Sequence, residues 1–359
     1  MNIRNFLIVL NVAIVSFFHS YAQKTANEWN QSGDDKYKTG NLKGSVSDFS
    51  KAISIGPETP EFYTNRGRSL ALLESYDKAL ADFSKAIALD STYSRAWYNR
   101  AFVKYQLADY QGAEFDNTQS IKHLPENKSA YNNRGNCRHQ QKKTQEALSD
   151  YTKAISLDPA FTMAYSNRGN LYMETGKIPD ALTDYNKALE IDSNYAGAWY
   201  NKGLLYDREK DYKTALYCYN RAIALDQEEA DFYLSRSLVR FYLGDIKGAK
   251  SDNKTTRKLD KDVPRLELNP AYSNEELINH FSEKYYEKGE NRMRKSEYKQ
   301  ALRFFNKAIE LKPEWADPFL QRGLILISID RKEEGCSDLE KAAALGNTTA
   351  ITEQKNLCR

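Results

Sequence analysis

The chain of 359 residues is long enough for two ordinary domains or for one long repeat array. Its 52 lysines and arginines are nearly balanced by 49 aspartates and glutamates, and these charges are scattered along the sequence. Balanced, scattered charge gives no footprint for nucleic acid or an anionic membrane, so we expect neither as a partner. The 41% of apolar residues, with 25 tyrosines, argues for a folded chain.

Residues 1–22 have the layout of a secretory signal peptide. Arg4 supplies a positive charge, an apolar run covers 6–18, and small residues stand at Ser20 and Ala22. The run spans 13 residues, against about 20 for a helix that crosses a bilayer, so an uncleaved anchor is the weaker alternative. We therefore expect cleavage after Ala22, no transmembrane segment in the mature chain, and an exported protein, periplasmic or secreted, in a compartment that permits disulfides.

From residue 26 onward the sequence repeats itself at an interval of 34 residues. In most units an aromatic residue precedes a glycine by four residues, and an alanine follows that glycine by twelve. Another aromatic residue comes four residues later, and a second alanine three residues after that. Ala101 takes the place of the glycine in the third unit. Seven units run without a gap, at 26–59, 60–93, 94–127, 128–161, 162–195, 196–229 and 230–263.

The register of the repeat is lost over 264–281, which we interpret as an insert or linker. Ser273 or Asn274 is predicted to cap a helix there, so that part of the insert lengthens the first helix of the next unit. Two further units follow over 282–349, the second of them degenerate, and 350–359 is predicted to be the end of a capping helix.

Each unit contains two apolar stripes at helical spacing, separated by a turn. One such hairpin cannot bury its own apolar face, so neighbouring hairpins must cover it. The order of aromatic residue, glycine, alanine, aromatic residue and alanine, with a closing proline in three units, resembles the tetratricopeptide repeat. The resemblance implies an all-α fold, a right-handed α-solenoid of about nine helix-turn-helix units with a C-terminal capping helix.

An arginine precedes the glycine position in six units, and an aspartate stands sixteen residues after each arginine. Where lysine replaces the arginine, at Lys202 and Lys288, the aspartate is absent as well, while Ser32 keeps Asp48. This joint occurrence predicts structural ion pairs, because polar residues in places that are usually apolar must satisfy one another. The alternative is a row of arginines that binds anions. The predicted pairs are Arg66–Asp82, Arg100–Asp116, Arg134–Asp150, Arg168–Asp184, Arg236–Asp252 and Arg322–Asp338.

The four cysteines fall into two groups. Cys137 and Cys218 lie in different units, on different helices of their hairpins, and are predicted to be free. Cys336 and Cys358 lie at similar distances on either side of a turn at 345–347, and an antiparallel helix pair would bring them level. We expect them to form a disulfide that holds the capping helix, the alternative being two free thiols. The remaining histidines show no ligand spacing, so neither a metal nor a cofactor is expected.

The sequence contains no GxSxG, HExxH or CxxC motif and no glycine-rich phosphate loop, so we expect no enzymatic activity. In the tetratricopeptide family, places two, five, six, nine, twelve and thirteen of the unit tend to face an inner groove; we call these the inner places. The resemblance therefore implies a peptide-binding surface that contains Asn65, Asn99, Asn133, Asn167, Asn201, Arg95, Tyr98, Tyr105, Asn132, Asn136, Asn170, Tyr200 and Arg208.

Place six is asparagine in five successive units, and a ladder of asparagines can hold peptide N–H and C=O groups. The alternative is that asparagine at this place serves packing. Two hypotheses for the function of the protein remain. The first is an exported adaptor that binds an extended segment of a protein partner in its groove. The second is a structural subunit of an envelope assembly, bound through its outer face and the 264–281 insert, which a groove filled by the chain itself would favour.

Overall fold

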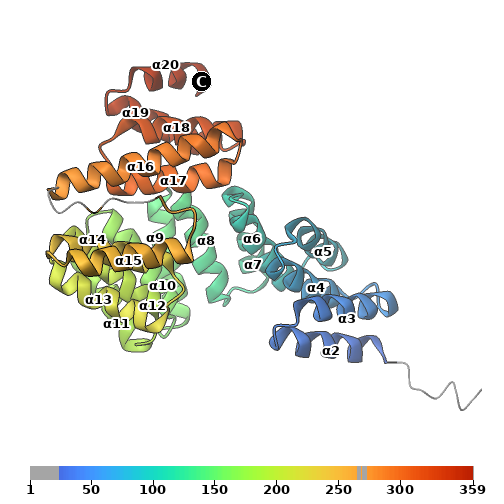
Figure 1. The fold of residues 1–359 in the computed structure, drawn as a ribbon. Helices are drawn as coiled ribbons and strands as arrows, with labels where there is room; N and C mark the ends of the chain where they lie inside the picture. Colours follow the sequence, from blue (N-terminus) through green and yellow to red (C-terminus); the bar gives the residue numbers. More distant parts are fainter. Residues whose placement is uncertain (1–23, 265–267, 269–272, 359) are drawn as a thin grey trace, which may run out of the picture. The chain divides into compact units, whose positions relative to one another are not determined.

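The computed structural model of the protein describes residues 24–264, 268 and 273–358. In these residues it contains 19 α-helices and no strand, so the all-α prediction is confirmed (Figure 1). The predicted signal peptide lies outside the described residues, as do 265–267 and 269–272 of the insert. The chain divides into two compact units, unit 1 up to Ala160 and unit 2 from Phe161 onward.

Both units consist of helix pairs that follow the 34-residue interval. The helices of unit 1 are α2 (Ala26–Lys38), α3 (Leu42–Ile55), α4 (Pro60–Leu72), α5 (Tyr76–Leu89), α6 (Ser94–Gln106), α7 (Tyr110–His123), α8 (Lys128–Gln140) and α9 (Thr144–Leu157). The helices of unit 2 are α10 (Thr162–Glu174), α11 (Ile178–Ile191), α12 (Ala196–Arg208), α13 (Tyr212–Leu225), α14 (Ala230–Tyr242), α15 (Ile246–Leu259), α16 (Asn274–Arg294), α17 (Tyr298–Leu311), α18 (Ala316–Ser328), α19 (Lys332–Ala344) and α20 (Thr348–Leu357).

The two helices of a pair are joined by a tight turn at place fifteen of the repeat. Its backbone is left-handed both where the residue is Gly40 (φ 77°) and where it is Ala108 (φ 61°). Glycine reaches this conformation without steric cost, whereas alanine does so under strain. The turn is therefore imposed by the packing of the helix pair rather than by the residue at its centre.

Glycine recurs in the repeated sequence because an aromatic ring lies directly against it. A Cβ atom at Gly135 would come within 2.6 Å of the Tyr151 ring, and one at Gly67 within 2.7 Å of the Phe83 ring. Ala101 is tolerated in the third repeat because the facing residue there is the smaller Asn117. The exception in the sequence thus follows from the same packing rule.

Helix α16 is longer than the other first helices. The side chain of Ser273 accepts from the backbone N–H of Glu276, and the Glu276 carboxylate accepts from the backbone N–H of Ser273. This capping box begins a helix of 21 residues, so α16 starts eight residues before the predicted unit at 282. The end of the insert is therefore part of the first helix of the eighth repeat.

The C-terminal helix α20 covers the last helix pair. Ala350 of α20 is buried with Phe319 and Leu339 in one apolar cluster. The structure places Cys336 and Cys358 in a disulfide, with Cα atoms 5.6 Å apart, and buries Cys137 and Cys218 as free thiols. The disulfide thus joins the end of the chain to α19.

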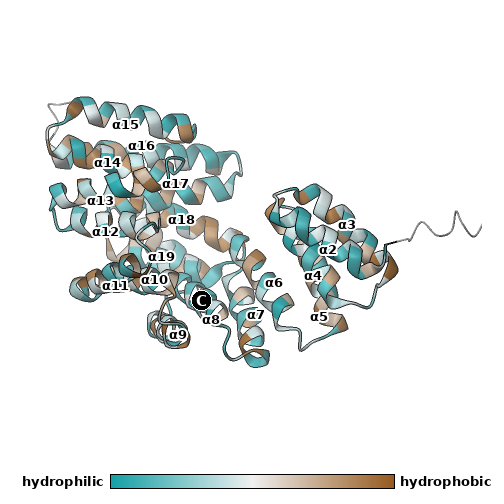
Figure 2. Cartoon of the chain, turned by 90° about the horizontal axis from the view of Figure 1, so that it is seen from below, coloured by the Kyte–Doolittle hydropathy of each residue, from teal (hydrophilic) through white to brown (hydrophobic). Residues whose placement is uncertain are grey.

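The helices are amphipathic rather than uniformly apolar. Figure 2 shows hydrophilic and hydrophobic segments on the same helices, and among the described residues no helix has the length and apolarity needed to cross a membrane. In the same part of the chain, histidines, cysteines and acidic residues form no group of three that could hold a metal ion.

Candidate interaction surfaces

The six arginine–aspartate pairs are in contact within their own hairpins. In each, the guanidinium donates two hydrogen bonds of 2.6–2.9 Å to the two carboxylate oxygens of the aspartate sixteen residues later. All six aspartates are buried. Because this edge of every guanidinium is occupied by its own carboxylate, the geometry favours structural pairs over a row of anion sites.

Sequence reasoning missed a second partner of these arginines, at place twenty-five of the preceding repeat. Nη1 of Arg66 donates to Oγ of Ser50 (3.1 Å), and Nη1 of Arg236 donates to Oδ1 of Asn220 (2.8 Å). The signal was present, because a hydroxyl or amide residue recurs at this place. The other contacts of this kind are Arg100–Ser84, Arg134–Thr118 and Arg322–Asn306. Each of these arginines therefore links its hairpin to the one before it.

The exceptions to the pair rule obey the same requirement for partners. Asp48, which lacks an arginine, binds Nζ of Lys36 at 2.6 Å and the hydroxyl of Ser32 at 2.7 Å. Lys202, which lacks an aspartate, donates to Oδ1 of Asn186 at 2.8 Å. Both charges are thus satisfied by residues of the same or the preceding repeat.

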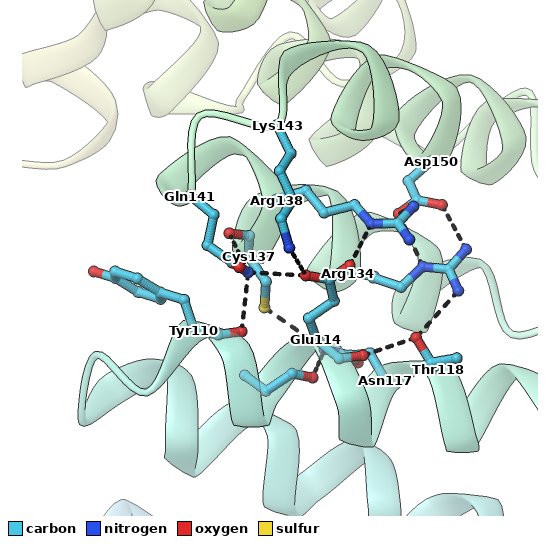
Figure 3. Close-up of polar contacts among 11 residues, drawn as sticks. Tyr110, Glu114, Asn117, Thr118, Arg134, Cys137, Arg138, Gln141, Lys143 and Asp150 are labelled. Carbon is cyan, nitrogen blue, oxygen red and sulfur yellow. Dashed lines mark hydrogen bonds and ion pairs between the residues drawn. The ribbon is translucent and has the colours of Figure 1, made fainter. Parts of the chain in front are cut away.

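A larger polar network surrounds Glu114 of α7 (Figure 3). Arg138 of α8 donates to Glu114 and to Asp150 of α9, each at 2.8 Å, and Lys143 and Gln141 reach the other Glu114 oxygen at 2.9 Å. Burial alone would raise the pKa of Glu114, but these three donors outweigh it and the pKa is lowered. The network holds the third and fourth repeats together through an ionised carboxylate.

The asparagine ladder is not a uniform binding surface. Asn65 is only 1% exposed, and its Nδ2 donates to Oδ1 of Asn30 at 3.0 Å. Asn132 is 3% exposed. The prediction that these two side chains face a groove is wrong, because both are buried, Asn65 against the preceding first helix. Asn201 makes the same backward contact, donating to Oγ of Ser166 at 3.2 Å.

Most of the other predicted surface residues are also engaged within the chain. Asn136 accepts from the hydroxyl of Tyr151 (2.8 Å), and Asn170 accepts from that of Tyr185 (2.7 Å). Arg208 is exposed and donates to the carbonyl of Met173 at 2.8 Å. Asn133 and Asn167 are half-buried. These amides therefore stabilise the repeats, whatever else they bind.

The two tyrosines predicted at places twelve and five of the third and sixth repeats are packed rather than open. Tyr105 lies against Tyr110, with ring centroids 5.2 Å apart, and Tyr200 lies against Phe232 at 4.7 Å. Burial raises the pKa of both phenols to about 12. These rings are half-buried and pack against the core of the repeats.

Three predicted residues, with two unpredicted neighbours, remain accessible in unit 1. Tyr98 of α6 is half-buried, as is Asn99, whose Nδ2 donates to the carbonyl of Arg95 at 2.7 Å, while the Arg95 side chain is exposed. Phe102, one turn further along α6, is 41% exposed, and Leu72 at the end of α4 is 53% exposed. We call Leu72 of α4, with Tyr98 and Phe102 of the neighbouring first helix α6, the apolar patch.

The inner places of the seventh repeat, in unit 2, are covered by the chain itself. Leu234, Leu238 and Phe241 of α14 are buried in one cluster with residues of α16 and α17. Both views show α16 beside α14 (Figures 1 and 2). The residues from the two covering helices are Leu277, Phe281 and Tyr285 of α16 and Phe304 and Ala308 of α17. We call these eight residues the covered cluster.

Sequence reasoning missed this covering, although a signal existed. Places five, nine and twelve are polar or mixed in most units but entirely apolar in the seventh. The eighth repeat also lost its ion pair here, because Phe304 is buried in the covered cluster while Lys288 contacts the carbonyl of Asp262. Arg292 of α16 pairs with the Asp262 side chain at 2.6 Å, which further fixes the covering hairpin.

Charged groups line the edge of the covered region. Burial raises the pKa of Asp207 of α12 to about 6, with Glu310 of α17 adding to the rise and Lys307 opposing it. The hydroxyl of Tyr219 donates to Asp207 at 3.4 Å and also opposes the rise. Asp207 is thus a half-buried acid whose environment includes residues of the covering hairpin.

The fold and its inner surface define a class of helix-hairpin repeat proteins. A protein-family model described as "TPR repeat" matches residues 67–107 and 169–209. Two family models described as "Tetratricopeptide repeat" match 129–161, 196–229 and 283–314. The chain therefore carries tetratricopeptide repeats, which are in general non-enzymatic and bind protein partners. No curated protein matches the chain.

Two solved structures with TM-scores of 0.50 or more share the helical fold, and a third shows a weaker likeness. A monomeric mutant of IFIT1 with Gppp-AAAA is 15% identical, with a TM-score of 0.51, over 89% of this chain and 81% of that one. PilW, a type IV pilus biogenesis factor, is 18% identical with a TM-score of 0.50, over 55% and 92% of the two chains. YrrB, a TPR protein with an unusual peptide-binding site, is 24% identical with a TM-score of 0.40, over 57% and 97%.

Proposed function

We propose that the protein is a non-enzymatic scaffold that binds a protein partner through the inner places of unit 1. One observation carries this proposal: in unit 1 the inner face of α6 keeps Phe102 accessible at 41%, whereas the corresponding Leu238 of α14 is covered at 8%. Accessible apolar and arginine side chains on a rigid helical frame are typical of interaction surfaces.

The asparagines make a smaller contribution than the sequence predicts. Asn99 and Asn133 are half-buried and belong to the same inner face, so their amides are placed to contact the main chain of a partner. Asn65 cannot do so without unpacking, because it is buried against Asn30. Within the ladder, Asn65 therefore serves packing, whereas Asn99 and Asn133 are assigned to binding.

A photo-cross-linking experiment in cells tests the proposal. Phe102 and Phe115 are replaced one at a time by the photoreactive p-benzoylphenylalanine; both are exposed, at 41% and 55%, but Phe115 lies on the second helix α7. We expect discrete protein adducts from position 102 and none from 115. Adducts at 115 alone would instead support the outer-face function, and the absence of any adduct at 102 would refute the scaffold proposal.

A structural subunit of an assembly is the second candidate, and the covered cluster favours it for unit 2. The insert is a poor docking element for that purpose, because its Leu268 is 5% exposed and packs in the apolar core that contains the covered cluster. A partner of unit 2 would therefore bind the outer helices rather than the insert. Cross-linking from Tyr217 of α13, which is 56% exposed, distinguishes this candidate.

We also propose that the protein is exported to the periplasm or secreted. The order of charge, apolar run and small residues in 1–22 supports this, and so does the disulfide between Cys336 and Cys358, which persists in oxidising compartments. N-terminal sequencing of the mature protein is expected to begin at Gln23. An intact Met1 in a membrane fraction would contradict export.

A further inference from the structure

Within this chain the seventh repeat provides an example of what its inner face accepts. Leu234, Leu238 and Phe241 stand at places five, nine and twelve of that repeat and are buried against α16 and α17. The α16 residues in the same cluster, Leu277, Phe281 and Tyr285, recur every four residues, which puts them on one face of a helix. An amphipathic helix is therefore the structural element that fits an apolar set of places five, nine and twelve.

Among the seven contiguous repeats, only the third and the seventh have apolar or aromatic residues at all three places. In the third repeat these residues are Tyr98, Phe102 and Tyr105. Tyr105 is half-buried and packs against Tyr110, while Phe102 stays 41% exposed. Leu72 of the preceding first helix adds a further exposed apolar side chain, at 53%. In the part of the chain that the structure describes, the third repeat thus has the apolar residues at these three places but no helix that covers them.

The charged residues near the apolar places of the third repeat indicate the sign of the charge that a bound partner would carry. Arg95 is exposed, and Arg68 stacks on the ring of Tyr37 at 4.6 Å. Within the part of the chain that the structure describes, neither arginine forms an ion pair with a carboxylate. This differs from the arginines before the glycine position, which are all paired. Residues 273–288, the N-cap and first part of α16, carry four glutamates and two lysines, a difference of −2, so a helix of this sequence has the sign that Arg68 and Arg95 favour.

We infer that the apolar patch of the third repeat is a docking site for an acidic amphipathic helix of a partner protein, bound as α16 is bound by the seventh repeat. The inference rests on the proposed scaffold function and makes it more specific. It replaces an extended segment by a helix with apolar residues four apart, and it locates the contact at α4 and α6. Apolar burial supplies the affinity, and Arg68 and Arg95 select acidic helices over basic ones.

The test uses a capped, fluorescein-labelled peptide of residues 273–288 as the probe and the full mature chain as the receptor. We expect saturable binding by fluorescence anisotropy, weakened roughly tenfold or more by Phe102→Asp and unchanged by Phe115→Asp on α7. Circular dichroism and thermal melting check that both variants fold, which is expected because both rings are exposed. The peptide with Leu277→Asp and Phe281→Asp is expected not to bind.

Two further arms separate the alternatives. A peptide with Ile278→Pro and Glu283→Pro cannot form the helix, so equal binding by this peptide would overturn the helical occupant. Arg95→Glu is expected to weaken binding at low salt and to differ little from wild type in 1 M salt, because exposed charges are screened there.

The outcomes are distinct from those of the cross-linking experiment. No binding of the 273–288 peptide, or binding that Phe102→Asp leaves unchanged, overturns the inference. The second result would place the peptide on the seventh repeat in exchange with α16. Neither result affects adducts formed from position 102 in cells, which decide the scaffold function alone.

Discussion

The third and seventh repeats place apolar residues at the same three inner places, with opposite outcomes. In the seventh repeat the residues are buried under α16 and α17, and in the third they are only partly covered. The helix pairs of the two repeats are held in the same way, since Arg100–Asp116 and Arg236–Asp252 form the same bidentate ion pair. The comparison shows that a repeat frame leaves its inner face free to serve either as core or as surface.

The largest expected difference between the two regions concerns stability. Phe281→Ala removes a ring that is 0% exposed in the covered cluster, and we expect it to lower the free energy of unfolding of unit 2 by about 3–5 kcal/mol. Phe102→Ala should change stability by less than about 0.5 kcal/mol, because its ring is exposed. Urea titrations of both variants check this. Equal losses would mean that the two faces are equally buried.

The ion pairs common to both regions form the next test. Asp150 is 3% exposed and accepts from both Arg134 and Arg138, so we expect Asp150→Ala to cost up to about 3–5 kcal/mol. Combining Arg134→Met with Asp150→Leu should recover much of the loss, because the apolar pair leaves Arg138 with Glu114 as its partner. The corresponding substitutions of Arg168 and Asp184, a pair in which Asp184 accepts from Arg168, serve as the matched control. Strictly additive losses in the cycle would contradict the coupling.

A smaller effect separates the regions by pH. The folded pKa of Asp207, about 6, lies above its ordinary value of 3.8, so the folded state binds the proton more tightly than the unfolded state. Asp207 therefore adds stability as the pH falls from 6 towards 4, and this contribution is absent above pH 6. Asp207→Asn should remove that dependence and stabilise unit 2 at pH 7 by roughly 1–3 kcal/mol. An unchanged pH profile in the variant would show that Asp207 is solvated.

The smallest effect concerns the asparagine ladder. Asn65→Ala removes a buried hydrogen bond to Asn30 and should cost about 1 kcal/mol. Asn99→Ala, at the same place one repeat later, removes a half-buried amide and should cost less than about 0.5 kcal/mol. Thermal melting of the two variants measures the difference. A larger loss for Asn99 would reverse the assignment of packing and surface roles.

The helix pairs and the arginine–aspartate contacts could be predicted because both depend on contacts that recur at fixed separations. Gly135 and Tyr151, or Arg134 and Asp150, reappear 34 residues later with the same geometry. A periodic constraint of this kind is visible in one sequence.

The covering of Leu238 by α16 could not be predicted in the same way, since it occurs once and joins residues with no repeated spacing. Apolarity at places five, nine and twelve indicated burial, but it did not reveal the covering element. The buried state of Asn65 was missed for a different reason: the same residue type at place six is buried in one repeat and half-buried in the next. Asn65 is paired with Asn30 at place five of the preceding repeat, a place whose residue varies from repeat to repeat.

The link that each arginine makes to the preceding repeat has a consequence for how such a gene can change in length. Excising residues 100–133 would join Asn99 to Arg134, which would then lie sixteen residues after Ser84 and sixteen before Asp150. Ser84 is the residue that Arg100 now contacts, so the Arg134 guanidinium and the Asp150 carboxylate would again have partners of the right kind. The excision also removes Glu114 and with it the contacts that Arg138 and Lys143 make to that carboxylate. Unequal recombination can therefore add or delete whole repeats while keeping the arginine–aspartate link, at the cost of the Glu114 network. The same deletion removes Phe102, so a change in the number of repeats can also remove the apolar patch.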